Sequence, residues 1–303
     1  MFDSAGNGKI TATCWEPAEK PIAVIQLVHG IAEHAGRYDD FANYLNGLGY
    51  LVVAEDHMGH GMSAAGGIKG YFSGGWWAAI EDAYKLMQMT MEQYPGIPYI
   101  LFGHSMGSFM ARSILAKYPQ SGISGCVICG TGWQPKLVLQ AGQLVASSIC
   151  KRKGEQNASQ TLHNIAFGAY NKRVEHPKTA YDWLSRDASI VDAYANDPLC
   201  GFQVSAGLMR AMFEGIAYIQ QKENIGRMDK TLPVLFIAGG DDPVGDYGNG
   251  VRKAAQVFRK AGMERVTIKI YPLCRHEILN EINKKDVYND LYTWISSVIN
   301  CTQ

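Results

Sequence analysis

One serine, one histidine and a pair of aspartates are spaced along this chain as the parts of a nucleophilic site would be. Ser105 lies between two glycines, Gly103 and Gly107, directly after the apolar run 98–102 and before a helix-like stretch. A serine hydroxyl is a poor nucleophile and needs a base, which in turn needs an orienting acid. A Gly-x-Ser-x-Gly match is weak alone and gains weight from its strand–turn–helix context. We therefore predict that Ser105 is a nucleophile; the alternative is a serine that caps the following helix.

The candidate base is His276, which follows the apolar run 265–271 and is the only histidine after residue 176. In sites of this kind the base stands at the end of a later strand than the nucleophile. A lone histidine is also common on protein surfaces and, hydrogen-bonded, in protein cores. The position after a strand favours the catalytic interpretation, so we predict that His276 accepts the proton of Ser105.

Two adjacent aspartates compete for the role of the acid. Asp241 and Asp242 follow the apolar run 232–238, and only one of the two can point at His276. Asp-Pro is a common turn pair, so either aspartate could merely fix the turn. We predict that Asp242 is the acid, with Asp241 as the alternative and Asp246 as a more distant candidate.

Acyl transfer also needs hydrogen-bond donors for the charge that develops on the carbonyl oxygen. One predicted donor is the backbone N–H of Met106, immediately after the nucleophile. The second donor usually comes from a loop that follows a strand and carries a His-Gly pair. His29-Gly30-Ile31 fits this description, so we predict the N–H of Ile31 as the second donor.

Short apolar runs alternate with helix-like stretches, and this alternation would bring the candidate residues together. We expect strands over residues 22–28, 50–54, 98–102, 123–129, 232–238 and 265–271, and helices over 37–48, 75–94, 106–118, 247–261 and 285–299. Such a pattern predicts an α/β fold with a mainly parallel central sheet and helices on both faces. Ligands bind at the carboxyl ends of parallel strands, which is where the candidate residues fall.

The alternation stops from Trp133 to about Phe202, where no β-type run occurs. We expect helices there over residues 134–150, 159–170 and 179–195, with a basic break at 151–153. The chain would then consist of a first core part (1–132), a helical insertion (133–205) and a second core part (206–303).

Composition excludes several classes of protein. The chain has 303 residues, 47% of them hydrophobic, and its 28 basic residues balance 28 acidic ones, so we expect no nucleic-acid partner. No apolar run reaches the roughly 18 residues of a membrane span. The N-terminus does not have the pattern of a signal peptide. Seven scattered cysteines are typical of a reducing cytoplasm, and we interpret Cys126 and Cys129 as two buried thiols, not a redox pair.

Four stretches together resemble the α/β-hydrolases of the monoacylglycerol lipase, lysophospholipase and serine aminopeptidase-like group. They are HGIAEHAGRY (29–38), EDHMGHGMS (55–63), GHSMG (103–107), and GGDDPVG (239–245) with RHEILNE (275–281). They lie in the order expected of this group and span most of the chain outside the insertion. The resemblance implies the α/β-hydrolase fold with a helical lid, and the hydrolysis of carboxylic esters.

The resemblance also implies residues at the polar end of a substrate pocket. Glu33 and Arg37 would lie near the site and bind a glycerol or a comparable polar group; the alternative is an ion pair that only fixes their loop. Animal monoacylglycerol lipases have a second histidine three residues after the catalytic one, near the glycerol. Here that place is Leu279, a departure that argues against strict monoacylglycerol specificity. Asp56 and His60 match a turn that we interpret as structural.

The insertion would be the lid of such an enzyme. Its apolar side chains would form an acyl-chain channel over the crevice; they are Trp133, Leu137, Leu139, Leu144, Val145 and Ile149. The alternatives are that they only pack the lid onto the core, or that they touch a lipid surface.

Three rival interpretations fit parts of the sequence. The stretch 59–64 matches a dinucleotide fingerprint, but no strand precedes it and no helix-like stretch follows it. A non-catalytic ligand receptor on the same fold would not need the complete triad. An aminopeptidase would need a carboxylate pair in the lid; the acidic residues available are Glu175, Asp182, Asp187, Asp192 and Asp197.

The sequence thus predicts a cytoplasmic serine esterase or lipase that uses neither a metal nor a cofactor. Its partner would be a small ester or lipid of the monoacylglycerol or lysophospholipid kind, cleaved through an acyl-enzyme on Ser105.

Overall fold

The computed structural model describes residues 1–64 and 67–301, and it is organised around one seven-stranded sheet. The strands lie in the order β3-β5-β4-β6-β7-β8-β9. Their bounds are β3 (Ala12–Trp15), β4 (Ala23–Val28), β5 (Tyr50–Glu55), β6 (Tyr99–His104), β7 (Gly125–Cys129), β8 (Val234–Gly239) and β9 (Val266–Tyr271). All pairs are parallel except β3 with β5. The mainly parallel sheet is therefore confirmed.

The N-terminal strands were not predicted. β3 is an antiparallel edge strand, and β1 (Phe2–Asp3) and β2 (Lys9–Ile10) form a separate two-stranded sheet. All three are short and mostly lack an apolar run, so the sequence gives little sign of them. The central strands β4 to β8 are buried along their whole length, as continuous apolar runs covered on both faces must be.

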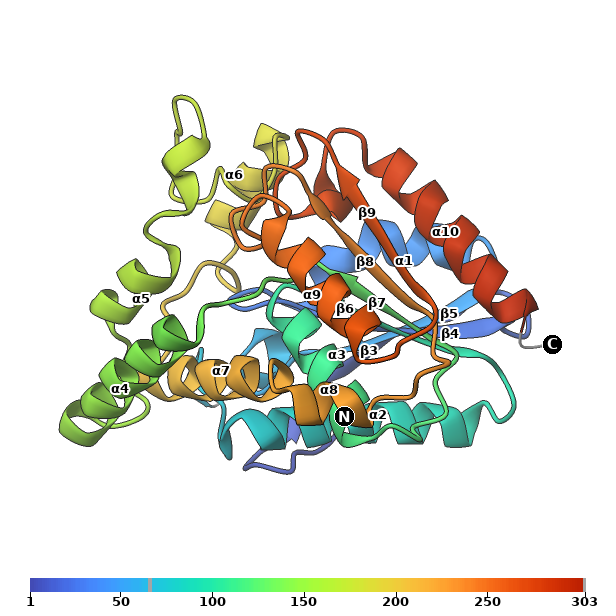
Figure 1. The fold of residues 1–303 in the computed structure, drawn as a ribbon, viewed down its shortest axis with the longest axis horizontal. Helices are drawn as coiled ribbons and strands as arrows, with labels where there is room; N and C mark the ends of the chain where they lie inside the picture. The colour runs from blue at the N-terminus through green and yellow to red at the C-terminus, as the bar shows by residue number, and fades with distance from the viewer. Residues whose placement is uncertain (65–66, 302–303) are drawn as a thin grey trace.

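Helices cover both faces of the sheet (Figure 1). On one face lie α1 (Asp39–Asn46) and α10 (Lys284–Asn300), which share a core with the sheet residues beneath them. On the other face lie α2 (Gly75–Gln93), α3 (Met106–Lys117), α7 (Ala206–Ile219), α8 (Lys222–Arg227) and α9 (Asn249–Lys260). Cys126 and Cys129 on β7 belong to opposite cores and are free thiols, which confirms the interpretation of two separate buried cysteines.

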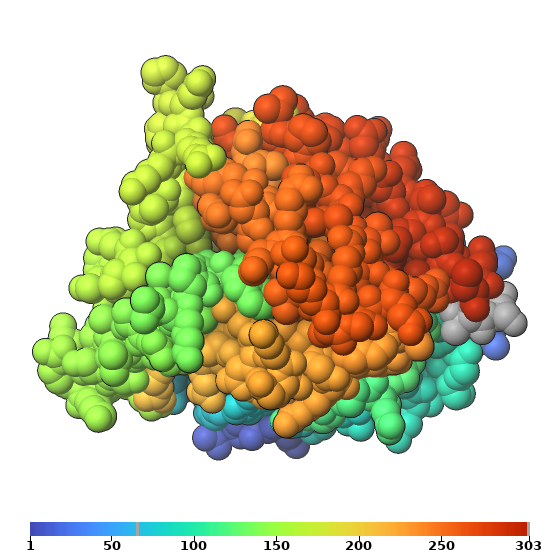
Figure 2. All heavy atoms as spheres, in the orientation of Figure 1, coloured from blue at the N-terminus to red at the C-terminus, as the bar shows by residue number. Residues whose placement is uncertain are grey.

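The stretch after β7 is helical, as predicted, and projects from one side of the molecule (Figures 1 and 2). It contains α4 (Lys136–Lys153), α5 (Gln160–Phe167), the 3₁₀ turn η3 (Tyr170–Arg173) and α6 (Ala188–Asn196). Within the described part of this stretch, β-type pairing is limited to one isolated bridge, Ala158 with Ser205. Helix α7 packs against both α4 and α3, so the exact division at residues 205 and 206 stays a prediction.

Two details of the predicted insertion are wrong. The basic residues 151–153 do not break a helix but form the last turn of α4, where positive charge is favourable to the helix dipole; Gly154, with φ of 89°, ends it. The predicted helix over 179–195 begins only at Ala188, because the Asp187 side chain accepts the N–H of Ser189 and caps α6 there. Among the described residues no helix is long and apolar enough to cross a membrane.

Candidate active site

Ser105 occupies a strained turn between β6 and α3. Its φ of 55° and ψ of −120° are unfavourable for a residue with a side chain, and its amide is held by the carbonyl of Cys129 at 3.0 Å. The flanking glycines are required by close packing. A Cβ on Gly103 would lie 2.2 Å from the Gly107 carbonyl oxygen, and a Cβ on Gly107 would lie 1.9 Å from the Val28 carbonyl oxygen. The turn therefore presents Ser105 where α3 meets the sheet.

The helix-capping alternative for Ser105 does not hold. Ser105 stands at the N-cap position of α3, but its side chain accepts no hydrogen bond from the first turn. The capping role that would explain a serine here is absent from the described structure, and the hydroxyl lies on the wall of a cavity. Within the described residues, the Ser105 hydroxyl therefore does not cap α3.

His276 and Asp242 meet although 34 residues separate them. The Nδ1 of His276 lies 2.9 Å from Oδ1 of Asp242, and both side chains are buried. Asp242 is held by its turn, where Oδ1 also accepts the N–H of Val244. The two other candidate acids, Asp241 and Asp246, are exposed to solvent. Of the three aspartates, the structure brings only Asp242 to the imidazole.

The surroundings of His276 favour its protonated form. Burial lowers the pKa of this imidazole, but the carboxylate of Asp242, with smaller contributions from Glu277 and Glu33, outweighs burial and raises the pKa above its ordinary value. Ser105 and His276 line the same cavity, although among the described residues no hydrogen bond joins the hydroxyl to the ring. Such contacts are often long before substrate binds.

The insertion holds the His276 loop from the other side. The backbone N–H of His276 donates to the Trp183 carbonyl at 3.3 Å, and the N–H of Glu277 donates to the Leu184 carbonyl at 2.8 Å. The Trp183 ring lies 5.1 Å from the imidazole, measured between centroids. This contact could not be predicted, because no sequence pattern pairs residue 183 with residue 276.

The two predicted oxyanion donors both lie on the cavity wall. Met106 is the first residue of α3, where backbone N–H groups have no partner within the helix. The N–H of Ile31 donates to no acceptor among the described residues. The loop of Ile31 is fixed by Asp56, whose Oδ1 accepts the N–H of Ala35 at 2.9 Å. The turn that contains Asp56 therefore supports the site, in line with its structural interpretation.

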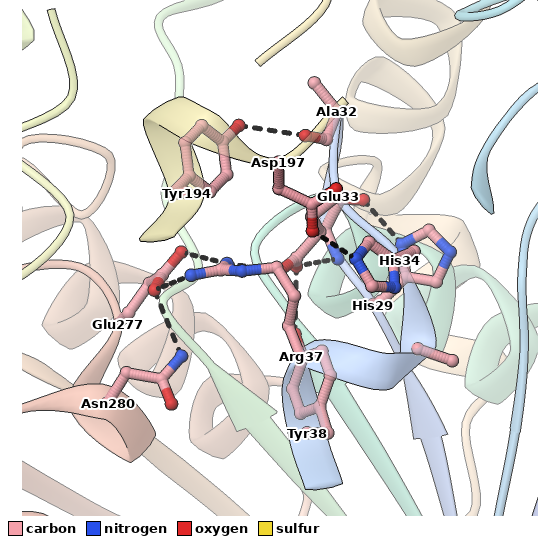
Figure 3. A network of polar contacts seen from close by, with 12 residues as sticks. His29, Ala32, Glu33, His34, Arg37, Tyr38, Tyr194, Asp197, Glu277 and Asn280 are labelled. Atoms are coloured by element: carbon pink, nitrogen blue, oxygen red, sulfur yellow. Dashed lines mark hydrogen bonds and ion pairs between the residues drawn. The ribbon is translucent and has the colours of Figure 1, made fainter. Parts of the chain in front are cut away.

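Glu33 and Arg37 form a buried ion pair beneath this loop (Figure 3). Glu33 accepts the N–H of Gly30 and the hydroxyl of Tyr38, and its other oxygen lies 2.8 Å from Nη1 of Arg37. The guanidinium also binds both oxygens of Glu277. Burial raises the pKa of Glu277, but Arg37 outweighs burial and holds the pKa at about 2.

The predicted contacts of Glu33 and Arg37 with substrate can be compared with this network. Glu33 lines the cavity and Arg37 does not. The structure thus contains the ion pair that was the alternative for these two residues, while a direct role for either in binding substrate stays a prediction. Glu277 was missed by sequence reasoning, because its partner Arg37 lies 240 positions away in the chain. Leu279 is buried against α1 and α10 and is not among the lining residues, so this position does not shape the cavity.

A cavity of about 650 Å³ opens at Ser105 and runs beneath the insertion. Its apolar lining combines core and insertion residues, among them Phe109, Leu139, Val145, Phe167, Met212 and Phe213. Of the six predicted channel residues, Leu139 and Val145 line it, whereas Trp133 and Ile149 pack against the core. Leu137 and Leu144 are 78% and 72% exposed. Packing alone therefore does not account for the apolar residues of α4.

The charges around the cavity are few. Among the described lining residues there is no lysine, arginine or aspartate, and the two glutamates, Glu33 and Glu277, are both engaged by Arg37. In the described chain one group has the spacing of metal ligands, His34 with Asp197 and Cys200, and none of these three lines the cavity.

Comparison with known proteins identifies the family. The pattern of the "Serine aminopeptidase, S33" family matches residues 19–283. A monoacylglycerol lipase of Mycolicibacterium smegmatis is 29% identical over 98% of this chain and 96% of its own length, and the human monoglyceride lipase is 28% identical over 93% of this chain and 85% of its own. A solved thermostable carboxyl esterase from Bacillus coagulans, in complex with glycerol, superposes with a TM-score of 0.89 at 32% identity over 98% of this chain and 97% of that one. The α/β-hydrolase fold is thereby confirmed, and the chain belongs to the S33 serine aminopeptidase family of α/β-hydrolases.

Proposed function

We propose that this protein hydrolyses carboxylic esters through an acyl-enzyme on Ser105. The observation that carries the proposal is the position of Ser105 in a strained turn on the wall of an apolar cavity. His276 lines the same cavity and is paired with the buried Asp242. Its monoacylglycerol lipase and carboxyl esterase relatives, similar over nearly their whole lengths, support the same reaction.

Each proposed residue has one task in the reaction. Ser105 Oγ attacks the ester carbonyl while Nε2 of His276 takes its proton, and Asp242 stabilises the imidazolium through Nδ1. The amides of Ile31 and Met106 donate hydrogen bonds to the tetrahedral oxyanion. His276 then protonates the departing alcohol, and a water molecule activated by the same imidazole releases the acid. No step requires a metal or cofactor.

The cavity favours a substrate with one acyl chain and an uncharged head. The apolar lining suits the chain, and the absence of lysine and arginine among the described lining residues leaves a phosphate without a counter-charge. Monoacylglycerols therefore fit better than lysophospholipids. The names of two relatives, monoacylglycerol lipase and monoglyceride lipase, support the same substrate.

An aminopeptidase would need an available carboxylate for the substrate ammonium. Asp182, Asp187 and Asp197 are engaged by Thr179, Ser189 and His34, respectively. Neither Glu175 nor Asp192 lines the cavity, and both glutamates that do are already ion-paired with Arg37. The described residues thus favour esters over aminoacyl amides, despite the name of the family.

The insertion, over residues 133–205, would act as the lid. Its exposed leucines on α4, Leu137 and Leu144, would touch the surface of a lipid aggregate and bring the cavity to its substrate. A cytoplasmic location is supported by the seven cysteines, which are all unpaired.

A substrate panel tests this function. Purified protein and Ser105→Ala would be assayed on monoacylglycerols, lysophosphatidylcholine, p-nitrophenyl esters and aminoacyl anilides. We expect the highest kcat/KM on monoacylglycerols and a loss of several orders of magnitude in the variant. Preference for anilides would favour the aminopeptidase, and turnover unchanged by Ser105→Ala, or none at all in the wild type, would favour a non-catalytic receptor.

A further inference from the structure

Three side chains with metal-binding chemistry meet where the insertion touches the loop of Ile31, and Figure 3 shows two of them, His34 and Asp197. His34 follows this loop, Asp197 ends α6, and Cys200 lies three residues further on. The Nε2 of His34 lies 2.8 Å from Oδ2 of Asp197, and one donor atom from each of the three residues lies within 4.8 Å of the others. We propose that His34, Asp197 and Cys200 bind a divalent transition-metal ion of the Zn²⁺ type.

The donor set suits such an ion. Imidazole, thiolate and carboxylate are the three common protein ligands of Zn²⁺, and two ligands separated by two residues, as in Asp197-x-x-Cys200, recur in zinc sites. Bonds of about 2.0–2.3 Å in a tetrahedron place the ligand atoms roughly 3.5 Å apart. The three donors lie within 4.8 Å of one another, and the His34–Asp197 pair, at 2.8 Å, would move apart to admit an ion that takes water as its fourth ligand.

The charges nearby also favour a dication. Arg37 carries one positive charge, and Glu33, Glu277 and Asp197 carry three negative ones, which leaves two negative charges before the thiol ionises. Binding would release the Cys200 proton to solvent as the sulfur–metal bond forms. The ion would therefore bring the net charge of this group closer to zero, from −2 to −1.

The site is reachable and bridges two parts of the chain. His34 and Asp197 are partly exposed, with side-chain accessibilities of 17% and 28%, while Cys200 is buried behind them. The same contact contains two hydrogen bonds to the carbonyl of Ala32, from the Tyr194 hydroxyl at 2.9 Å and from the Gly201 amide at 3.0 Å. A bound ion would replace the direct His34–Asp197 hydrogen bond at this contact and tie Cys200 to the same point.

Direct titration tests the proposal without reference to activity. Metal-free wild-type protein would be titrated with Zn²⁺ by calorimetry and with Co²⁺ by absorption, since a cobalt–thiolate bond gives a charge-transfer band. We expect one ion per chain, a rise in Tm with Zn²⁺, and at least tenfold weaker binding in His34→Ala and Asp197→Ala. Cys200→Ser should lose the charge-transfer band, whereas Cys200→His should bind Zn²⁺ and still lack the band.

Matched controls exclude binding elsewhere. Cys150→Ser removes another buried cysteine, and His176→Ala removes an exposed histidine, and both should bind as the wild type does. In the wild type, Zn²⁺ should also slow alkylation of Cys200, mapped by peptide mass spectrometry, a readout that needs no variant. The proposal is overturned by no stoichiometric binding, by alkylation of Cys200 that Zn²⁺ leaves unchanged, or by binding that survives His34→Ala. Since the readout is metal binding, these results leave the proposed hydrolysis untouched.

Discussion

Replacing Arg37 with methionine separates the two roles considered for this residue. The substitution keeps most of the side-chain volume and removes the guanidinium from between Glu33 and Glu277, each only 4% exposed. If Arg37 mainly neutralises these buried carboxylates, the variant loses stability. If Arg37 mainly binds substrate, KM rises and stability stays the same.

The expected magnitude follows from the burial and the pKa values. Removing one partner of a buried ion pair costs about 3–5 kcal/mol. The pKa of Glu277 is about 2 instead of its ordinary value of 4.5, which corresponds to about 3 kcal/mol. Because this pKa is lowered on folding, the stabilisation is complete above about pH 4.5 and is lost as the pH falls toward 2. The deficit of Arg37→Met should therefore be largest near neutral pH and shrink toward pH 4, where the unpaired carboxyls take up protons.

Urea unfolding followed by tryptophan fluorescence, at several pH values, measures this difference. The matched control is Lys284→Met, which breaks an ion pair with the exposed Asp40 and should cost less than about 1 kcal/mol. Adding Glu277→Gln to Arg37→Met removes one buried carboxylate that has lost its partner. The double variant should therefore lose less stability than the sum of the losses in the two single variants. A loss in Arg37→Met no larger than that of Lys284→Met would refute the assignment of Arg37 to the buried network.

Three further predictions concern the base, the turn and the lid. Because the pKa of His276 is raised, the acid limb of the pH profile of kcat/KM should lie above about pH 6.5. Asp242→Asn should move this limb to lower pH and cut kcat by about 10⁴-fold. A limb that does not move would contradict the pairing of His276 with Asp242. Gly107→Ala places a Cβ 1.9 Å from a backbone oxygen, so it should prevent folding or lower the free energy of unfolding by several kcal/mol, measured by thermal unfolding. The control Gly226→Ala, in α8, places a Cβ that meets nothing within 4 Å and should leave stability unchanged or raise it. Leu137→Ser with Leu144→Ser should lower hydrolysis of micellar monoacylglycerol and leave a dissolved short ester unaffected; equal losses on both would argue against surface contact.

Much of the fold could be predicted because each central strand is a continuous apolar run with a helix-like stretch after it. The same rule brought the candidate site residues together, since Ser105, Asp242 and His276 each follow a strand and parallel strands end at one edge. Details at the ends of elements were harder to predict. Strand β3 is short and largely exposed, and residues 151–153 resembled a break although they suit a helix C-terminus.

What could not be predicted depends on contacts between distant residues. Arg37 and Glu277 are 240 positions apart, and nothing in either local sequence specifies their pairing. The same is true of Trp183 and His276, which meet only because the insertion folds back over the sheet. Sequence patterns report local periodicity and strand ends, whereas these pairs depend on the path of the chain between them.

Labelling with a fluorophosphonate, a reagent that phosphonylates an activated serine, tests the central assignment most directly. With the site located by peptide mass spectrometry, we predict one label per chain, on Ser105, and a labelling rate that falls by several orders of magnitude in His276→Ala. A label on another residue, or a rate on Ser105 that His276→Ala leaves unchanged, would contradict the proposed triad.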